Sequence, residues 1–337
     1  MLILKRAIYE LELRNEIKDQ VNDIDSPLGC FMGKSQVLEK IKNEARQVAQ
    51  SDFSVIIEGE TGTGKTVLAR EIHNLSPRKE KPFVKVDIGT LAESLIESEL
   101  FGHQKGSFTG AEKRKIGFFE AAHTGTLFID EIENMSHAIQ CKLLNVVEDK
   151  KVCPVGSNEP MEVDFRVIAA TNVNIKDCIA DKKIRMDLYY RLNEFVITLP
   201  PLRERPEDIV FFAGKFLVEA CRDLGKADMD ITAEAVDILN RHPWPGNIRE
   251  LKNIMRKAVL FSPDGLISAH LMKSLTAGSD AKAISAPKGS MKEMVKLQEI
   301  QVIKRALAAA GGNKKKAAQL LGISARGLYS KIRKYAM

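Results

Sequence analysis

The sequence predicts an α/β protein in which helices cover a parallel sheet, followed by a helical domain and a small helical module at the C-terminus. Five short apolar runs alternate with helical stretches between about residues 36 and 200, and no such run follows Pro201. This alternation is typical of a parallel sheet with both faces buried. The segment 276–290 is rich in Ala, Gly, Ser and Pro without periodicity, which indicates a flexible linker before the last module.

The expected elements follow from apolar spacing. Residues 1–24 are predicted to form one helix, because Leu4, Ile8, Leu11 and Ile17 recur at near-helical spacings. Strands are expected at Val55–Ile57, Val84–Val86, Leu127–Ile129, Val167–Ala170 and Phe195–Leu199. Several helices should lie between Glu207 and about Leu275. The expected domains are therefore a linker helix at 1–24, an α/β domain at 25–200, a helical lid at 201–275, a linker at 276–290 and a helical module at 291–337.

The first helix begins within its own apolar pattern. It is either an ordinary amphipathic helix or the end of a connection from a regulatory domain, such as a receiver or sensor, and we expect it to pair chains. No run of about 18 apolar residues and no signal peptide occur, so we expect a cytoplasmic protein without membrane contact. Five cysteines without a C-x-x-C pair argue against a disulfide framework or a zinc module.

The net charge of +6 is concentrated near the C-terminus. Residues 311–337 carry seven basic residues and no acid, whereas residues 1–310 sum to −1. A concentrated positive segment is typical of phosphate binding, although a solvated face gives the same pattern. Charge alone leaves both readings open.

The run from Gly59 to Thr66 matches the pattern G-x-x-x-x-G-K-[ST], directly after a predicted strand and directly before a helical run. In such a P-loop, backbone N–H groups wrap the phosphates of a nucleotide. Lys65 would neutralise the β and γ oxygens, and Thr66 would offer its hydroxyl to Mg²⁺. The candidate nucleotide-binding residues are Gly59, Glu60, Thr61, Gly62, Thr63, Gly64, Lys65 and Thr66.

Two acids end the predicted strand at Leu127–Ile129. Asp130 is expected to face Mg²⁺ together with Thr66, and Glu131 to polarise the water that attacks ATP. Two acids at a strand end can also be merely solvated, but the P-loop favours the metal and catalytic roles.

Residues 97–111, ESELFGHQKGSFTGA, are similar to the hallmark stretch of one family. Here the sequence resembles the AAA+ ATPases, and specifically the bacterial enhancer-binding activators of sigma-54 RNA polymerase, over nearly the whole chain. The resemblance implies an AAA+ P-loop ATPase fold with a helical lid. In that family a G-A-F-T-G-A loop contacts sigma-54, and this chain differs from it by one small residue. The corresponding residues are Gly106, Ser107, Phe108, Thr109, Gly110 and Ala111. From the residues alone, the loop is a turn with either an exposed or a tucked Phe108.

Further positions match the family in order. The resemblance implies that Asn172 senses the γ-phosphate. It implies that Arg185 and Arg191 complete the site of a neighbouring subunit, and that Arg249 faces the nucleotide from the lid. One position departs from it. Many relatives carry an asparagine that bonds the catalytic glutamate where this chain has Asp87, and the resemblance makes this position the switch that couples nucleotide state to the loop. Two carboxylates do not share a hydrogen bond unless a proton, water or cation intervenes.

The last module is predicted to be a helix-turn-helix that binds double-stranded DNA. Asn313 and Ser324 would cap two helices around a turn at Gly322, and the run resembles the Fis-type domain of these activators, which implies dimers and a palindromic site. Arg326 and Lys331 are expected near the groove, and the lysines at 314–316 on phosphate. The DNA-binding candidates are Lys314, Lys315, Lys316, Ser324, Arg326, Tyr329, Ser330, Lys331 and Arg333.

The resemblance implies an ATPase that assembles as a hexameric ring, hydrolyses ATP with Mg²⁺ between subunits and converts a closed complex of sigma-54 RNA polymerase into an open one from upstream DNA sites. The alternative is a DNA-binding regulator that keeps the ATPase fold without remodelling sigma-54, which the near-intact loop disfavours. A general unfoldase or helicase motor would explain neither this loop nor the Fis-like tail.

Overall fold

The computed structural model describes residues 33–107, 111, 113–262 and 265–280, with side chains as far as 277, and 314, 318–319, 328 and 331 near the C-terminus. The chain divides into two compact units, Met1–Gly278 and Ser279–Met337. The helix predicted for residues 1–24 lies outside the described residues.

Five parallel strands form the central sheet of the first unit, in the order β2-β3-β6-β1-β7. Their bounds are β1 Val55–Glu58, β2 Phe83–Asp87, β3 Thr126–Asp130, β6 Arg166–Thr171 and β7 Phe195–Thr198. Each strand lies where the sequence predicts one. In parallel strands the carboxyl ends meet at one edge of the sheet, and the register places Asp87 beside Asp130 and Glu58 beside Thr171 at that edge.

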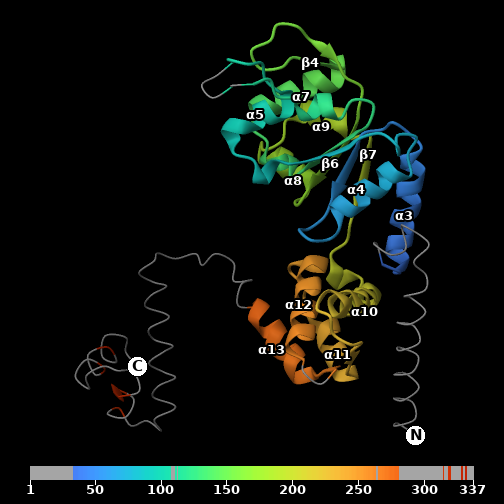
Figure 1. The fold of residues 1–337 in the computed structure, drawn as a ribbon, viewed down its shortest axis with the longest axis vertical. Helices are drawn as coiled ribbons and strands as arrows, with labels where there is room; N and C mark the ends of the chain where they lie inside the picture. The colour runs from blue at the N-terminus through green and yellow to red at the C-terminus, as the bar shows by residue number, and fades with distance from the viewer. Residues whose placement is uncertain are drawn as a thin grey trace. The chain divides into compact units, whose positions relative to one another are not determined.

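Two layers of helices cover the sheet (Figure 1). Helices α3 (Gln36–Ala49) and α4 (Lys65–Asn74) pack on one face, against a core that includes Ile57 and Phe128. The other face, with Ile56 and Leu127, is covered by helices α5 Glu93–Phe101, α6 Phe118–Ala121, α7 His137–Asp149, α8 Ile175–Ala180 and α9 Met186–Leu192. Neighbouring strand residues enter opposite cores because side chains alternate along a strand.

Short elements connect these layers. Single turns of 3₁₀ helix occur as η1 (Ile88–Thr90), η2 (Ile132–Asn134) and η3 (Leu202–Glu204). Strands β4 (Lys151–Val152) and β5 (Met161–Glu162) form an antiparallel pair. The sequence does not predict this pair, because two residues per strand are too short to show a period.

The lid is a helical bundle with its own core (Figure 1). Its helices are α10 Pro206–Asp223, α11 Ala233–Arg241, α12 Asn247–Phe261 and α13 Ala269–Asp280, with a short parallel pair of β8 Asp230–Ile231 and β9 Leu266–Ile267. Trp244 is fully buried, and its indole Nε1 donates to the carbonyl of Leu239 at 2.8 Å. Helix α13 continues to Asp280, into the segment 276–290 for which composition predicts a linker, and Thr276 is buried there.

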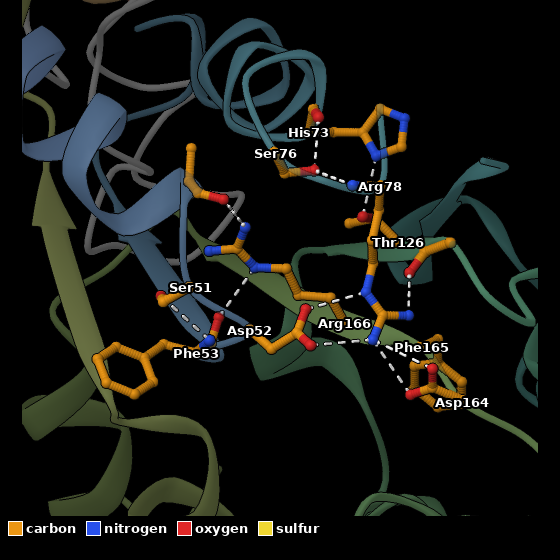
Figure 2. Close-up of polar contacts among 12 residues, drawn as sticks. Ser51, Asp52, Phe53, His73, Ser76, Arg78, Thr126, Asp164, Phe165 and Arg166 are labelled. Atoms are coloured by element: carbon orange, nitrogen blue, oxygen red, sulfur yellow. Dashed lines mark hydrogen bonds and ion pairs between the residues drawn. The ribbon is translucent and has the colours of Figure 1, made fainter. Parts of the chain in front are cut away.

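A buried arginine ties the sheet to the end of helix α3 (Figure 2). Arg166, the first residue of β6, is only 2% exposed. Its guanidinium donates to the carbonyls of Val48 at 2.8 Å, Ala49 at 3.2 Å and Phe53 at 3.0 Å. Burial lowers the pKa of Arg166 to about 10, so it stays charged at neutral pH. It thus satisfies carbonyls at the C-terminal end of a helix, where positive charge is favourable.

Arg166→Met should therefore destabilise the sheet domain. The change leaves three carbonyls without their donor, and we expect a loss of about 3 kcal/mol in the free energy of unfolding. Urea denaturation measures this loss. Arg46→Met is the matched control, because Arg46 is exposed on α3 and donates only to Asn43 at 2.8 Å, and it should change stability by less than about 0.5 kcal/mol. Equal stability of the two variants would contradict the role of Arg166.

Candidate functional site

The P-loop connects β1 to α4 at the carboxyl edge of the sheet. Gly62 (φ 81°) and Gly64 (φ 110°) adopt left-handed backbone conformations that favour glycine. Helix α4 begins at Lys65 without a side-chain cap, so its first N–H groups remain available to an anion. The backbone at residues 59–66 thus has the shape that a phosphate cradle at the predicted position would need.

Lys65 lies inside this loop and is 6% exposed. Its Nζ donates to the carbonyls of Gly59 at 2.6 Å and Glu60 at 3.2 Å, and to Oδ1 of Asn172 at 2.6 Å. Burial lowers the pKa of Lys65, while the negative charges of Asp130 and its neighbouring acids oppose that effect. The ammonium is thus held mainly by neutral oxygens, which a phosphate can replace.

Thr66 and Asp130, the two predicted magnesium ligands, lie together. The Thr66 hydroxyl donates to Oδ2 of Asp130 at 3.3 Å. Lys85 of β2 contacts both, with its Nζ 3.3 Å from Thr66 Oγ1 and 3.4 Å from Asp130 Oδ2. Hydroxyl and carboxylate oxygens suit Mg²⁺, and the ammonium beside them indicates that the pair attracts a cation.

Among the described residues, no group of three or more His, Cys, Asp or Glu side chains is arranged to hold a metal. The oxygens of Thr66 and Asp130 fit an ion that is bound through one or two protein oxygens and the phosphates of a nucleotide, as is usual for Mg²⁺. Lys85 was missed by sequence reasoning. Side-chain alternation could have found it, because Lys85 lies two residues before Asp87 on the same face of β2.

Glu131 follows β3 directly, and two amides hold its carboxylate. Oε1 accepts from Nδ2 of Asn172 at 2.9 Å, and Oε2 accepts from Nδ2 of Asn134 at 2.9 Å. The backbone N–H of Asn172 donates to Oε1 of Glu133 at 3.0 Å. The structure thus brings together the predicted sensor and the predicted catalytic acid, and adds Asn134, which sequence reasoning missed.

Asp87, the predicted switch residue, ends β2 in register with Asp130. Its Oδ1 is buried and has no hydrogen-bond partner in the described structure. A carboxylate offers no donor to Glu131, and the amides of Asn172 and Asn134 already occupy both oxygens of Glu131.

Residues of the lid junction contact the P-loop directly. Asn247 Nδ2 donates to Oε2 of Glu60 at 3.2 Å and to the carbonyl of Thr61 at 3.0 Å, and the N–H of Ile248 donates to the carbonyl of Gly62 at 3.0 Å. A side chain at Gly62 would overlap the carbonyl of Gly246 in the lid. The loop and the lid are therefore linked through backbone as well as side chains.

An ion pair reinforces this link. Arg203 binds the Glu60 carboxylate through both of its Nη atoms, at 2.7 and 2.8 Å, and this hydrogen bonding lowers the pKa of Glu60. The predicted lid arginine, Arg249, is exposed on α12 next to Ile248. Arg203 and Asn247 were missed as site residues, although they stand in the runs LPPLRER and WPGNIREL.

Arg185 and Arg191 lie on the surface at α9. Arg185 pairs with Asp187 at 2.6 and 3.0 Å and thereby lowers the pKa of Asp187 to about 2. Arg191 lies 3.9 Å from Glu194. Their side chains are about one-third exposed, so both remain accessible at the surface of the subunit.

The base of the predicted sigma-54 loop is well defined. His103 forms β-bridges with Lys115 and with Val155, and the N–H of Gly106 donates to the carbonyl of Ala111 at 2.8 Å. The two ends of the loop are thus held together at a hydrogen-bonded base, which the segment around Val155 supports.

Ser107, which stands where relatives have alanine, fits this base. Its hydroxyl donates to the carbonyl of Gln104 at 2.9 Å, and a side chain at Gly156 would come within 2.5 Å of Ser107 Cβ. Phe108, Thr109 and Gly110 lie outside the described residues.

Two of the DNA-binding candidates lie in the part of the second unit that is described. Lys314 is helical and exposed, and Lys331 is helical and partly exposed. Helical Ala318 and Leu328 are buried, as expected for the core of a helical module. The other candidates lie outside the described residues, namely Lys315, Lys316, Ser324, Arg326, Tyr329, Ser330 and Arg333.

None of the helices in the described ranges is long and apolar enough to cross a membrane. The cysteines in those ranges carry no disulfide; they are Cys141, Cys153, Cys178 and Cys221.

A parallel sheet with a P-loop after β1, acids after β3, an asparagine after β6 and a helical lid defines the AAA+ class of P-loop NTPases. Three family models match consecutive parts of the chain: the sigma-54 interaction domain at residues 31–198, the AAA+ ATPase lid domain at 203–287 and the Fis family of bacterial regulatory proteins at 295–335. The chain belongs to the sigma-54-dependent transcriptional regulators.

Relatives agree with this assignment. The regulatory protein AtoC of Escherichia coli K12 is 36% identical over 343 residues, covering 100% of this chain and 74% of AtoC. The formate hydrogenlyase transcriptional activator FhlA of the same organism is 40% identical over 321 residues, covering 94% of this chain and 46% of FhlA. This chain spans about half the length of the first curated relatives it matches.

A crystal structure of NtrX from Brucella abortus in complex with ATP is similar in fold, with a TM-score of 0.74 and 28% identity. The match covers 100% of this chain and 75% of that one.

Proposed function

We propose that this chain is an ATP-driven transcription activator that remodels sigma-54 RNA polymerase from the closed to the open promoter complex. The observation that carries the proposal is the run of hydrogen bonds from Lys65 through Asn172 to Glu131. It joins the phosphate cradle to the predicted catalytic acid in a chain that matches the sigma-54 interaction domain. The loop GSFTGA of this chain differs by one residue from the family's G-A-F-T-G-A.

In the proposed mechanism, Lys65 exchanges the carbonyls of Gly59 and Glu60 for the β and γ oxygens of ATP. Thr66 and Asp130 would hold Mg²⁺, which supplies positive charge to the phosphate oxygens when bound. Glu131 orients the attacking water and accepts its proton. Asn172 reports the state of the P-loop to Glu131, because its amide bonds Lys65 on one side and Glu131 on the other.

We further propose that hydrolysis takes place between subunits of a hexameric ring. Arg185 and Arg191 are exposed and would reach the γ-phosphate of a neighbouring subunit's ATP, where a planar guanidinium stabilises developing charge. Arg249 would face the nucleotide from the lid, since the adjacent Ile248 already contacts the P-loop.

The loop at residues 106–111 would carry the mechanical output to sigma-54, and its hydrogen-bonded base gives it a firm attachment. The Fis-type module would bind palindromic upstream DNA as a dimer, which raises the local concentration of the ring at the right promoter. Such a protein acts in the cytoplasm.

Thr109→Ala tests this coupling. We expect the full chain to form open complexes with sigma-54 polymerase on a premelted promoter, and Thr109→Ala to lose that activity while hydrolysing ATP within about threefold of the wild-type rate, because the loop contacts polymerase and not nucleotide. Ser274→Ala, which removes an exposed hydroxyl from α13, should behave as wild type. ATP hydrolysis by the wild type without open complexes would favour a DNA-binding regulator that keeps the fold but does not remodel sigma-54.

A further inference from the structure

The turn after β3 brings an unexpected side chain to the catalytic acid. Glu131 has a left-handed backbone (φ 56°, ψ 48°) and begins the 3₁₀ turn η2 (Ile132–Asn134). The N–H of Asn134 donates to the carbonyl of Glu131 at 3.0 Å and closes the turn. This geometry folds the Asn134 side chain back onto the Glu131 carboxylate, and such a backbone conformation costs energy that the surroundings must offset.

The two oxygens of the Glu131 carboxylate have different partners. Oε1 accepts from Asn172, whose own Oδ1 accepts from Lys65 in the P-loop. Oε2 accepts from Asn134, at 2.9 Å. One amide therefore belongs to the nucleotide-sensing network, whereas the other belongs to the same turn as Glu131.

The backbone of Gly89 leaves the room that this arrangement needs. A side chain at Gly89 would overlap Oε2 of Glu131 and would come within 3.3 Å of Nδ2 of Asn134. The turn η1, which follows β2, is therefore shaped around the hydrogen bond between Glu131 and Asn134.

Asp87 leaves the end of strand β2 without an amide. It stands in register with Asp130 on the same face of the sheet, and it adds a carboxylate beside the acids that end β3. Because an ionised carboxylate accepts hydrogen bonds and donates none, Asp87 cannot provide the donor that an asparagine at this position would carry. Strand β2 has no donor to offer at this position, and the turn after β3 provides one.

We propose that Asn134 is the positioning residue that restrains Glu131, and that the amide function missing from β2 at Asp87 has moved to this turn. The proposal rests on the proposed role of Glu131 in ATP hydrolysis. When Lys65 turns toward the γ-phosphate, Asn172 loses one of its two partners and can release Oε1, while Asn134 keeps Oε2 and limits the directions in which the carboxylate swings. Asn134 thus determines how the Glu131 carboxylate is oriented toward the attacking water.

Reciprocal exchange tests the proposal. Asn134→Asp keeps the size of the side chain, removes the donor and places a second carboxylate against Glu131. We expect kcat for ATP hydrolysis by the full chain to fall about tenfold or more, with KM for ATP within about twofold of the wild type, because nucleotide binding does not depend on this hydrogen bond. The double variant Asn134→Asp, Asp87→Asn has an amide at the end of β2 that can donate to Glu131. Its kcat should therefore return to within about threefold of the wild type.

Asn240→Asp, at an exposed position of α11, introduces the same charge away from the site and should leave kcat unchanged. A wild-type kcat in Asn134→Asp, or a loss that Asp87→Asn does not repair, would overturn the assignment. Failure of the proposed function looks different, because Glu131→Gln would then also hydrolyse ATP at the wild-type rate.

Discussion

Lys65→Met should weaken the binding of ATP and ADP about a hundredfold, which corresponds to about 3 kcal/mol. The reason is the position of the ammonium, which is 6% exposed and held inside the P-loop by the carbonyls of Gly59 and Glu60 and by Asn172. Removing it leaves the phosphates in the cradle without their nearest buried positive charge. Titration with a fluorescent nucleotide measures the change in affinity.

Lys79→Met is the control for this prediction, because Lys79 is an exposed lysine in the loop before β2 and should bind nucleotide as the wild type does. Lys65→Met should also lose the rise in melting temperature that saturating nucleotide gives the wild type, since only the folded state binds nucleotide. An unchanged dissociation constant in Lys65→Met would show that nucleotide binds elsewhere.

Glu131→Gln should reduce the rate of ATP hydrolysis by a factor of about 100 to 10,000 and change nucleotide affinity by less than about threefold. Glutamine has the same shape but cannot accept the proton of the attacking water. Its contacts with the amides of Asn172 and Asn134 must also rearrange, because both neighbours are donors to the present carboxylate.

Single-turnover hydrolysis separates this chemical step from product release. Glu148→Gln, an exposed acid on α7, is the matched control and should keep the wild-type rate. A Glu131→Gln variant that hydrolyses ATP normally would assign the base to another residue.

Local patterns made much of the fold predictable. The five strands were found because each is a short apolar run between helical stretches, and the P-loop because its residues are consecutive. The strand order β2-β3-β6-β1-β7 depends on long-range pairing, which apolar spacing does not encode. The end of α13 at Asp280 was missed because alanine and serine occur in helices as readily as in linkers.

In the site, too, residues in local motifs were predictable and residues that depend on long-range contacts were not. Lys65 was predicted from the P-loop motif, Asp130 and Glu131 from their place after a strand, and Asn172 from the family resemblance. The structure brings these side chains together at one edge of the sheet.

The missed residues are Lys85, Asn134, Arg203, Asn247 and Arg166. Asn134 acts within a turn that contains a left-handed residue, and the others contact partners in different elements. The type of each residue alone therefore does not indicate a role. Asp87 was recognised as a departure from the family, but only the geometry shows amides from two other positions on Glu131.

The most direct test of the central claim is promoter opening by sigma-54 polymerase in the presence of this chain, with ATP in one reaction and a non-hydrolysable ATP analogue in another. Opening can be followed by permanganate reactivity of unpaired thymines. We expect opening with ATP, no opening with the analogue, and no opening by Glu131→Gln with ATP. Equal opening with ATP and with the analogue would contradict the central claim, because hydrolysis at this site would then not drive the polymerase.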